Sequence, residues 1–159
     1  GIRRRRCSGT TLQWTVAQLV YRLEYNGRSV VISGDTRYSR NTIKYAKGAD
    51  LLIHEGHAGL DEKIVDGALT NGNGRPQAGS HHTGPKAAGT IFTRAAPKMA
   101  LYTHIVWGRK SEQELIALTR ETYAGPLTVG KEMMQVRVAD TVEIVGSNST
   151  GQRRTGTNP

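Results

Sequence analysis

The sequence is poor in cysteine and in long apolar runs, and each shortage excludes a class of protein. Among 159 residues there is one cysteine, Cys7, so neither a disulfide framework nor a cysteine-based zinc site is possible. No apolar run approaches the roughly 18 residues that a membrane-spanning helix needs. No leading segment joins a basic stretch to an apolar one, so no secretory signal is visible and a cytoplasmic location is the default expectation.

The net charge of +9 is concentrated at the two ends of the chain. The run Arg3–Arg6 and the pair Arg153 and Arg154 account for six of these charges, which leaves +3 for the body. A folded surface that binds a phosphate backbone needs Lys and Arg spread along it. We therefore expect basic, disordered ends at residues 1–10 and 146–159 around one domain at residues 11–145, with RNA binding by the ends as a minor alternative.

Alternation of strands and helices predicts an α/β layered domain. Asn26-Gly27 lies between two β-prone runs and indicates a hairpin, because a type I′ turn requires positive φ at both central residues. Ser111 and Glu114 match a capping box at the start of a helix that we expect to run to about Tyr123. Further helices are expected at residues 39–48 and 85–96 (with Thr83 as a possible N-cap), strands at 50–55, 98–104, 127–129, 134–138 and 142–145, and a loop at 71–80.

Three expected strands end in residues that bear ligand-type side chains: Asp35, the pair His54 and Glu55, and His104. Strand ends are where functional groups converge in layered α/β proteins, and His81-His82 precedes a helix nearby. One carboxylate with several imidazoles suits zinc or a similar divalent ion. Each residue also has an ordinary structural interpretation: a turn for Asp35, the core for His104, a cap or a lysine pair for Glu55, and a solvated turn for His81-His82.

Four ordered motifs resemble the later half of the metallo-β-lactamase-fold hydrolases. They are Val30-Val31-Ile32-Ser33-Gly34-Asp35-Thr36, Lys47-Gly48-Ala49-Asp50-Leu51-Leu52-Ile53-His54-Glu55, His81-His82-Thr83-Gly84-Pro85-Lys86-Ala87-Ala88-Gly89 and Lys98-Met99-Ala100-Leu101-Tyr102-Thr103-His104. The similarity runs from about Tyr21 to Val145 and is strongest to the branch of ribonuclease Z, the tRNA 3′-end endonuclease, and the arylsulfatase-like enzymes. The resemblance implies one αββα-type half of a four-layer sandwich, with a mixed sheet and helices packed on one face.

The resemblance also implies roles for individual residues. Asp35 would bridge two Zn²⁺ or other divalent ions, and His104 would be a ligand of the second ion. His54 and Glu55 match the His-Glu pair before the active-site histidine loop. His82, with His81 as the alternative if the register differs by one, would be oriented by Glu55 and would protonate the leaving oxygen.

The sequence departs from the family pattern at the first metal. No histidine occurs before His54, so the motif His-x-His-x-Asp-His and the middle ligand histidine are both absent. Gly84 stands where the family loop usually has a threonine. Only Asp35 and His104 remain from the metal shell, and a catalytic zinc normally needs three protein ligands. We therefore expect a C-terminal half, inactive by itself, whose uncovered sheet face favours homo-oligomers or other association.

The function predicted is metal-dependent hydrolysis of a phosphate, sulfate or carboxylic ester by hydroxide activated at two metal ions. No long or basic arm that could hold tRNA is apparent between Tyr21 and Val145, which favours a small-molecule ester of the arylsulfatase-like type. A ribonuclease Z-like endonuclease acting on tRNA is the first alternative. A non-catalytic remnant or binding module is the second.

Overall fold

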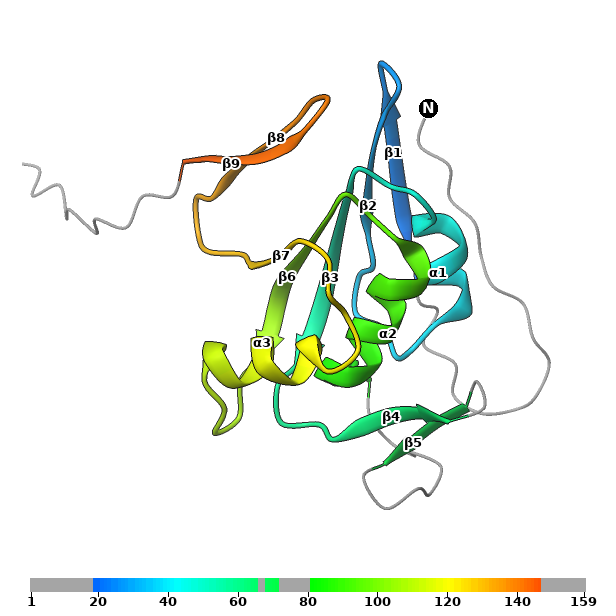
Figure 1. Ribbon diagram of the computed structural model, residues 1–159, viewed down its shortest axis with the longest axis vertical. Helices are drawn as coiled ribbons and strands as arrows, with labels where there is room; N and C mark the ends of the chain where they lie inside the picture. The colour runs from blue at the N-terminus through cyan, green and yellow to red at the C-terminus, as the bar shows by residue number, and fades with distance from the viewer. Residues whose placement is uncertain (1–18, 66–67, 72–80, 147–159) are drawn as a thin grey trace, which may run out of the picture.

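A five-stranded mixed sheet forms the centre of the molecule (Figure 1). The computed structural model describes residues 19–65, 68–71 and 81–146. The strand order is β1-β2-β3-β6-β7; β1 and β2 are antiparallel, and the remaining neighbours are parallel. The strands are β1 (Tyr21–Tyr25), β2 (Arg28–Ile32), β3 (Leu51–His57), β6 (Met99–Val106) and β7 (Leu127–Val129).

The hairpin predicted from Asn26-Gly27 is confirmed. Asn26 and Gly27 have φ values of 47° and 72°, and Tyr25 pairs with Arg28 across the turn. Both central residues thus adopt the left-handed region that a two-residue hairpin loop requires. The first β-prone run before Leu19 lies outside the described residues, as do residues 1–10 and 147–159 of the expected ends and most of the expected loop at 71–80. Gly146, which was expected to begin the disordered end, is instead the last residue of a strand.

Three helices cover one face of the sheet (Figure 1): α1 (Arg40–Ala46), α2 (Pro85–Ala95) and α3 (Glu112–Arg120). The capping box at Ser111 and Glu114 is present. Helix α3 ends at Arg120 rather than near Tyr123, whose ring packs in the core. The N-cap of α2 is Gly84 and not Thr83, because the Thr83 hydroxyl donates to the Thr36 carbonyl 2.7 Å away. In the described part of the chain, no helix is both long enough and apolar enough to cross a bilayer.

Strand alternation divides the apolar residues between the two faces of the sheet. Val31, Leu52 and Tyr102 are buried under the helices, where they meet residues such as Ile91 and Phe92. The fold predicted from the resemblance, a mixed sheet with helices on one face, is confirmed by this arrangement.

Two further hairpins lie beside the main sheet. The pair β8 (Gln135–Val138) and β9 (Val142–Gly146) agrees with the expected closing strands. The pair β4 (Glu62–Val65) and β5 (Ala68–Asn71) was not predicted, although the sequence places the turn dipeptide Asp66-Gly67 between them.

The face of the sheet opposite the helices is open. A groove of about 790 Å³ runs along it and is lined mainly by aliphatic side chains. Its walls come from the sheet and from the β8–β9 hairpin: Val30, Leu51, Ile53, Leu101, Ile105, Trp107, Met134, Val136 and Val138.

Candidate active site

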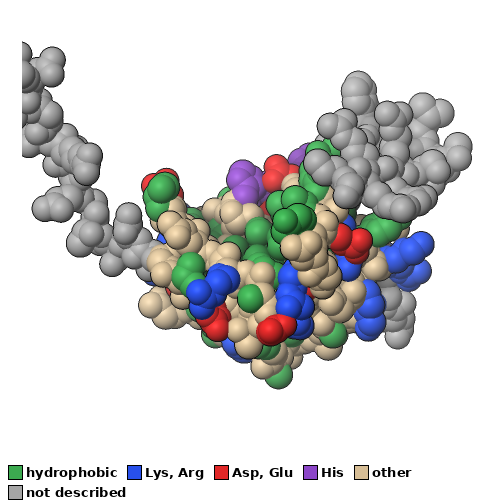
Figure 2. Space-filling view, turned by 90° about the horizontal axis from the view of Figure 1, so that it is seen from above, with side chains coloured by type: hydrophobic (Ala, Val, Ile, Leu, Met, Phe, Trp, Pro, Cys, Tyr) green, Lys and Arg blue, Asp and Glu red, His purple; other side chains and the backbone are tan. Residues whose placement is uncertain are grey.

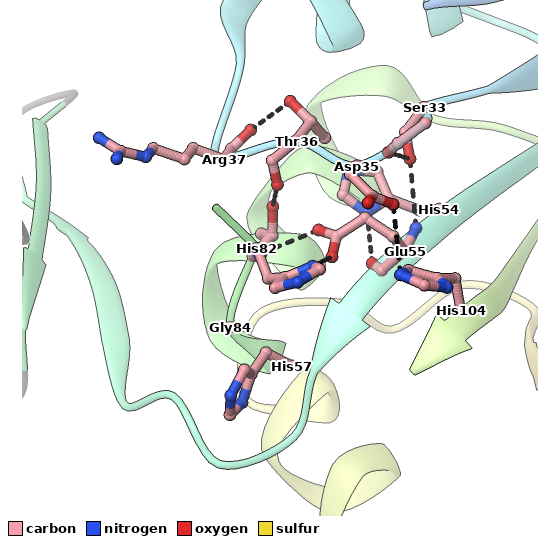
Figure 3. Close-up of polar contacts among 12 residues, drawn as sticks. Ser33, Asp35, Thr36, Arg37, His54, Glu55, His57, His82, Gly84 and His104 are labelled. Atoms are coloured by element: carbon pink, nitrogen blue, oxygen red, sulfur yellow. Dashed lines mark hydrogen bonds and ion pairs between the residues drawn. The ribbon is translucent and has the colours of Figure 1, made fainter. Parts of the chain in front are cut away.

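The carboxyl ends of three parallel strands bring the predicted residues to one edge of the sheet (Figure 3). Asp35 follows β2, Glu55 belongs to β3 and His104 belongs to β6. His82 approaches the same edge from the segment before α2. Residues that are 20 or more positions apart in the sequence thus meet because parallel strands end at a common edge.

Asp35 and His104 form the exposed part of the site. Asp35 Oδ1 lies 3.4 Å from His104 Nε2, and both side chains are more than half exposed. Figure 2 shows histidine and acidic side chains next to each other at the upper rim of the molecule. His104 has a φ of 45°, the left-handed region that a non-glycine residue adopts only at a cost. With this backbone conformation the imidazole lies beside Asp35.

Glu55 and His82 form the buried part of the site. His82 Nδ1 donates to Glu55 Oε2 at 2.6 Å, and the Thr83 amide donates to Glu55 Oε1 at 2.8 Å. Burial raises the pKa of the Glu55 carboxyl to about 7, and the hydrogen bonds from His82 and Thr83 oppose that rise. Since Nδ1 is engaged by Glu55, His82 presents Nε2 to the space beside Asp35 and His104.

Asp35, His82 and His104 are placed so that they could hold a divalent ion. One ligand atom from each lies within 4.8 Å of the other two. Carboxylate oxygen and imidazole nitrogen are ordinary ligands of zinc. A histidine whose second nitrogen is bonded to a carboxylate, as His82 is to Glu55, is a common arrangement in metal sites. The donor chemistry of this edge therefore fits a metal ion.

His54 and His81 are not brought into this cluster. His54 is completely buried, donates from Nδ1 to the Glu55 carbonyl at 2.6 Å and packs edge-on against Phe92. Burial lowers the pKa of His54 to about 4. His81 is exposed, and the carboxylate contact goes to its neighbour His82.

His57 lies at the site and was not among the sequence candidates. Its ring centroid is 6.2 Å from that of His82, and its Nδ1 accepts a hydrogen bond from the Gly59 amide at 3.2 Å. The sequence feature that could have identified His57 is its position two residues after Glu55, at the carboxyl end of β3.

The sequence is similar to several ribonucleases. It is 31% identical over 115 residues to ribonuclease Z of Methanothermobacter thermautotrophicus, a match that covers 70% of this chain and 33% of that protein. It is 31% identical over 104 residues to ribonuclease Z of Myxococcus xanthus, covering 65% of this chain and 30% of that one. No family model matches the chain.

A solved structure shares the fold. The metallo-β-lactamase fold protein YhfI from Bacillus subtilis superimposes with a TM-score of 0.55 at 22% identity, over 73% of this chain and 42% of that one. The chain has a partial metallo-β-lactamase fold, and its sequence is similar to that of ribonuclease Z.

The chain spans about a third of the length of the two ribonuclease Z relatives. Within this partial metallo-β-lactamase fold, Asp35 and His104 stand at the positions that the resemblance gives to metal ligands. The Glu55–His82 pair stands beside them, as the resemblance also implies. The relatives are ribonucleases, which gives the ribonuclease Z alternative better support than the small-molecule ester predicted first.

Proposed function

We propose that the chain carries the later half of the active site of a metal-dependent phosphodiester hydrolase that acts on tRNA 3′ ends, as ribonuclease Z does. The observation that supports this most strongly is the Glu55–His82 pair, in which the second ring nitrogen of His82, Nε2, faces Asp35 and His104. The names of the sequence relatives support RNA as the substrate. The preference for a small-molecule ester rested on the lack of a long or basic arm, and a chain that spans a third of its relatives does not test that argument.

Asp35 and His104 are the proposed metal ligands, with Zn²⁺ as the proposed ion and two ions in a complete site. A bound divalent ion would supply hydroxide near neutral pH and stabilise charge on the attacked group. Both ligand side chains are exposed at the sheet edge, so a phosphodiester can reach them from solvent. His82 faces the same space, since one ligand atom from each of the three residues lies within 4.8 Å of the other two.

His82 is the proposed proton donor for the leaving oxygen. Glu55 fixes the ring by accepting from Nδ1, and its carboxylate stabilises the charged imidazolium that gives up a proton from Nε2. Glu55 is nearly completely buried, so this support is little screened by water. His54, inside the core, contributes to the position of β3 rather than to proton transfer.

The proposal is tested by incubating the full chain with Zn²⁺ and measuring bound metal and cleavage of a tRNA precursor with a 3′ extension. We expect at least one ion per chain, and cleavage at the 3′ end only after addition of a chain that carries the first metal motif His-x-His-x-Asp-His, because the sequence predicts that this half is inactive by itself. Cleavage of an aryl sulfate but not of the precursor by the two chains together would restore the small-molecule interpretation. The absence of bound metal would favour a non-catalytic remnant, and bound metal without cleavage of either substrate by the two chains together would contradict the proposal.

The role of His82 is tested by His82→Ala, with His81→Ala as the matched control at the neighbouring position. In the assay with both chains, we expect kcat to fall by about 10²–10⁴-fold, the usual contribution of a general acid, while the metal content of the substituted chain stays within error of the unsubstituted one. Loss of the metal together with the activity would show that His82 is a ligand and not a proton donor.

A further inference from the structure

We propose that Glu62, on β4, is a positioning residue that holds the His82 segment against the Asp35 loop. The inference rests on the proposed function, because the geometry it controls is that of the proposed metal ligands and proton donor. Glu62 belongs to the hairpin β4–β5, which neither the sequence motifs nor the family resemblance drew attention to. Its side chain is completely buried.

Glu62 binds the backbone two residues after His82. The Gly84 amide donates to Glu62 Oε2 at 2.7 Å, next to the Thr83 amide that donates to Glu55 Oε1 at 2.8 Å. The buried carboxylates of Glu55 and Glu62, which belong to different strands, therefore accept hydrogen bonds from two consecutive backbone amides. Both amides lie at the N-terminal end of α2, where the helix dipole favours negative charge. The segment from His82 to Gly84 is held from two sides.

The close approach of the Leu60 backbone, with Glu62 beside it, explains the glycine at position 84. A Cβ atom on Gly84 would lie 2.8 Å from the Leu60 carbonyl oxygen and 3.2 Å from Glu62 Oε2. The distance to the Leu60 oxygen is shorter than the contacts that Cβ atoms make in proteins, and this backbone oxygen cannot move aside as a flexible side chain could. The threonine usual in the family loop would not fit here without a shift of the Leu60 backbone, so glycine lets the amide of residue 84 approach Glu62.

Glu62 also faces the loop that carries Asp35. Arg37, two residues after Asp35, attracts the Glu62 carboxylate electrostatically. Thr83 Oγ1 donates to the Thr36 carbonyl at 2.7 Å and ties the same two loops together (Figure 3). Glu62 thus lies behind both loops, where it can set the distance between Asp35 and His82.

The burial of Glu62 is costly, which argues against a purely stabilising role. Glu62 Oε1 is buried and has no hydrogen-bond partner among the described residues. Leaving such a group without a partner lowers the stability of the folded chain, and an apolar side chain at the position would avoid the cost. A group that is expensive for folding but bonded to the loop of the site fits a positioning role.

The test uses the full chain and compares Glu62→Leu with Glu62→Gln, with Asp61→Asn as the matched control at the exposed neighbouring acid. Zn²⁺ affinity is measured by calorimetry, and hydrogen exchange at the Thr83 and Gly84 amides by NMR. We expect Glu62→Leu to weaken Zn²⁺ binding by about 10-fold, because the Thr83–Thr36 hydrogen bond passes the displacement on to the loop of the proposed ligand Asp35, and to speed exchange at Gly84. Glu62→Gln keeps an acceptor for the Gly84 amide and should stay within about threefold of the unsubstituted chain.

A structural role alone would lower the unfolding free energy of Glu62→Leu but leave the Zn²⁺ affinity of the folded chain unchanged, and that result would overturn the inference. If Glu62→Leu does not fold, Gly84→Ala displaces the same contact and must produce the same loss of affinity. If the unsubstituted chain binds no Zn²⁺, the proposed function fails by itself. The inference is then judged by amide exchange and by the Nδ1 tautomer of His82 in nitrogen chemical shifts, which must change in Glu62→Leu and recover in Glu62→Gln.

Discussion

His54 and His82 both contact Glu55, and their surroundings give them different chemistry. His54 donates to the Glu55 backbone carbonyl from inside the core, and its Nε2 has no partner within the described residues. His82 donates to the Glu55 carboxylate from the surface and keeps its second nitrogen towards the site. In the sequence the two histidines are equivalent candidates. Burial separates them, because a fully buried imidazole cannot reach a substrate.

The pH dependence of stability should reveal the buried imidazole. Burial lowers the pKa of His54 from 6.5 to about 4. Between pH 6.5 and pH 4, His54 is therefore protonated in the unfolded chain and neutral in the folded chain. The contribution of the neutral His54 to the free energy of unfolding is therefore complete above about pH 6.5. It falls by up to about 3 kcal/mol as the pH drops towards 4. The Glu55 carboxyl, whose pKa is raised to about 7 by burial, acts in the opposite direction and flattens the overall profile.

The measurement is chemical denaturation of the unsubstituted chain and of His54→Asn between pH 7 and pH 4. Asparagine keeps a donor for the Glu55 carbonyl but does not titrate. The difference in unfolding free energy between the two should shift in favour of the variant as the pH falls. His81→Asn, at an exposed position, controls for the removal of one histidine. A difference that is constant with pH would contradict the prediction.

At the scale of elements, local sequence signals predicted the boundaries they control. The Ser111 hydroxyl accepts from the Glu114 amide, and the Glu114 carboxylate accepts from the Ser111 amide, so the start of α3 depends on four consecutive residues. The end of α3 was placed too late, because Tyr123 leaves the helix to pack against Phe92. A cap is a local device, whereas the last turn depends on tertiary packing.

The capping box gives a prediction at this scale. Ser111→Ala removes the acceptor for the Glu114 amide and should lower the unfolding free energy by about 1 kcal/mol. The exposed position makes a packing effect small, so the change reports the cap. Glu112→Gln, in the same helical turn, serves as the control and should cost only a few tenths of a kcal/mol. Equal losses in the two variants would argue against the cap.

At the scale of the molecule, an open groove lined mainly by apolar side chains lies opposite the helices. Contiguous apolar surface of this kind favours association in water. Val136 and Val138 on β8 form one of its walls, while Arg137 between them points to the other face of the strand.

We predict that the full chain self-associates through this groove at micromolar concentration. Val136→Lys places a charge in the groove, and burying a lysine without a partner is costly. The substitution should raise the dissociation constant of the oligomer, measured by sedimentation, by about 10-fold. Arg137→Gln, one residue away and outside the groove, should leave the profile nearly unchanged. Sedimentation as a monomer before any substitution would show that the open face does not drive association.

The sequence alone determined the features that depend on neighbouring residues: the Asn26-Gly27 turn, the cap at Ser111, the α/β order and the ligand-type residues at three strand ends. These follow from backbone preferences and short-range hydrogen bonds. Only the tertiary structure decided that Glu55 bonds to His82, that His54 lies in the core and that Glu62 reaches Gly84 from an unexpected hairpin. Such contacts join segments 20 or more residues apart, and their geometry is set by strand register and side-chain packing, which no local pattern encodes.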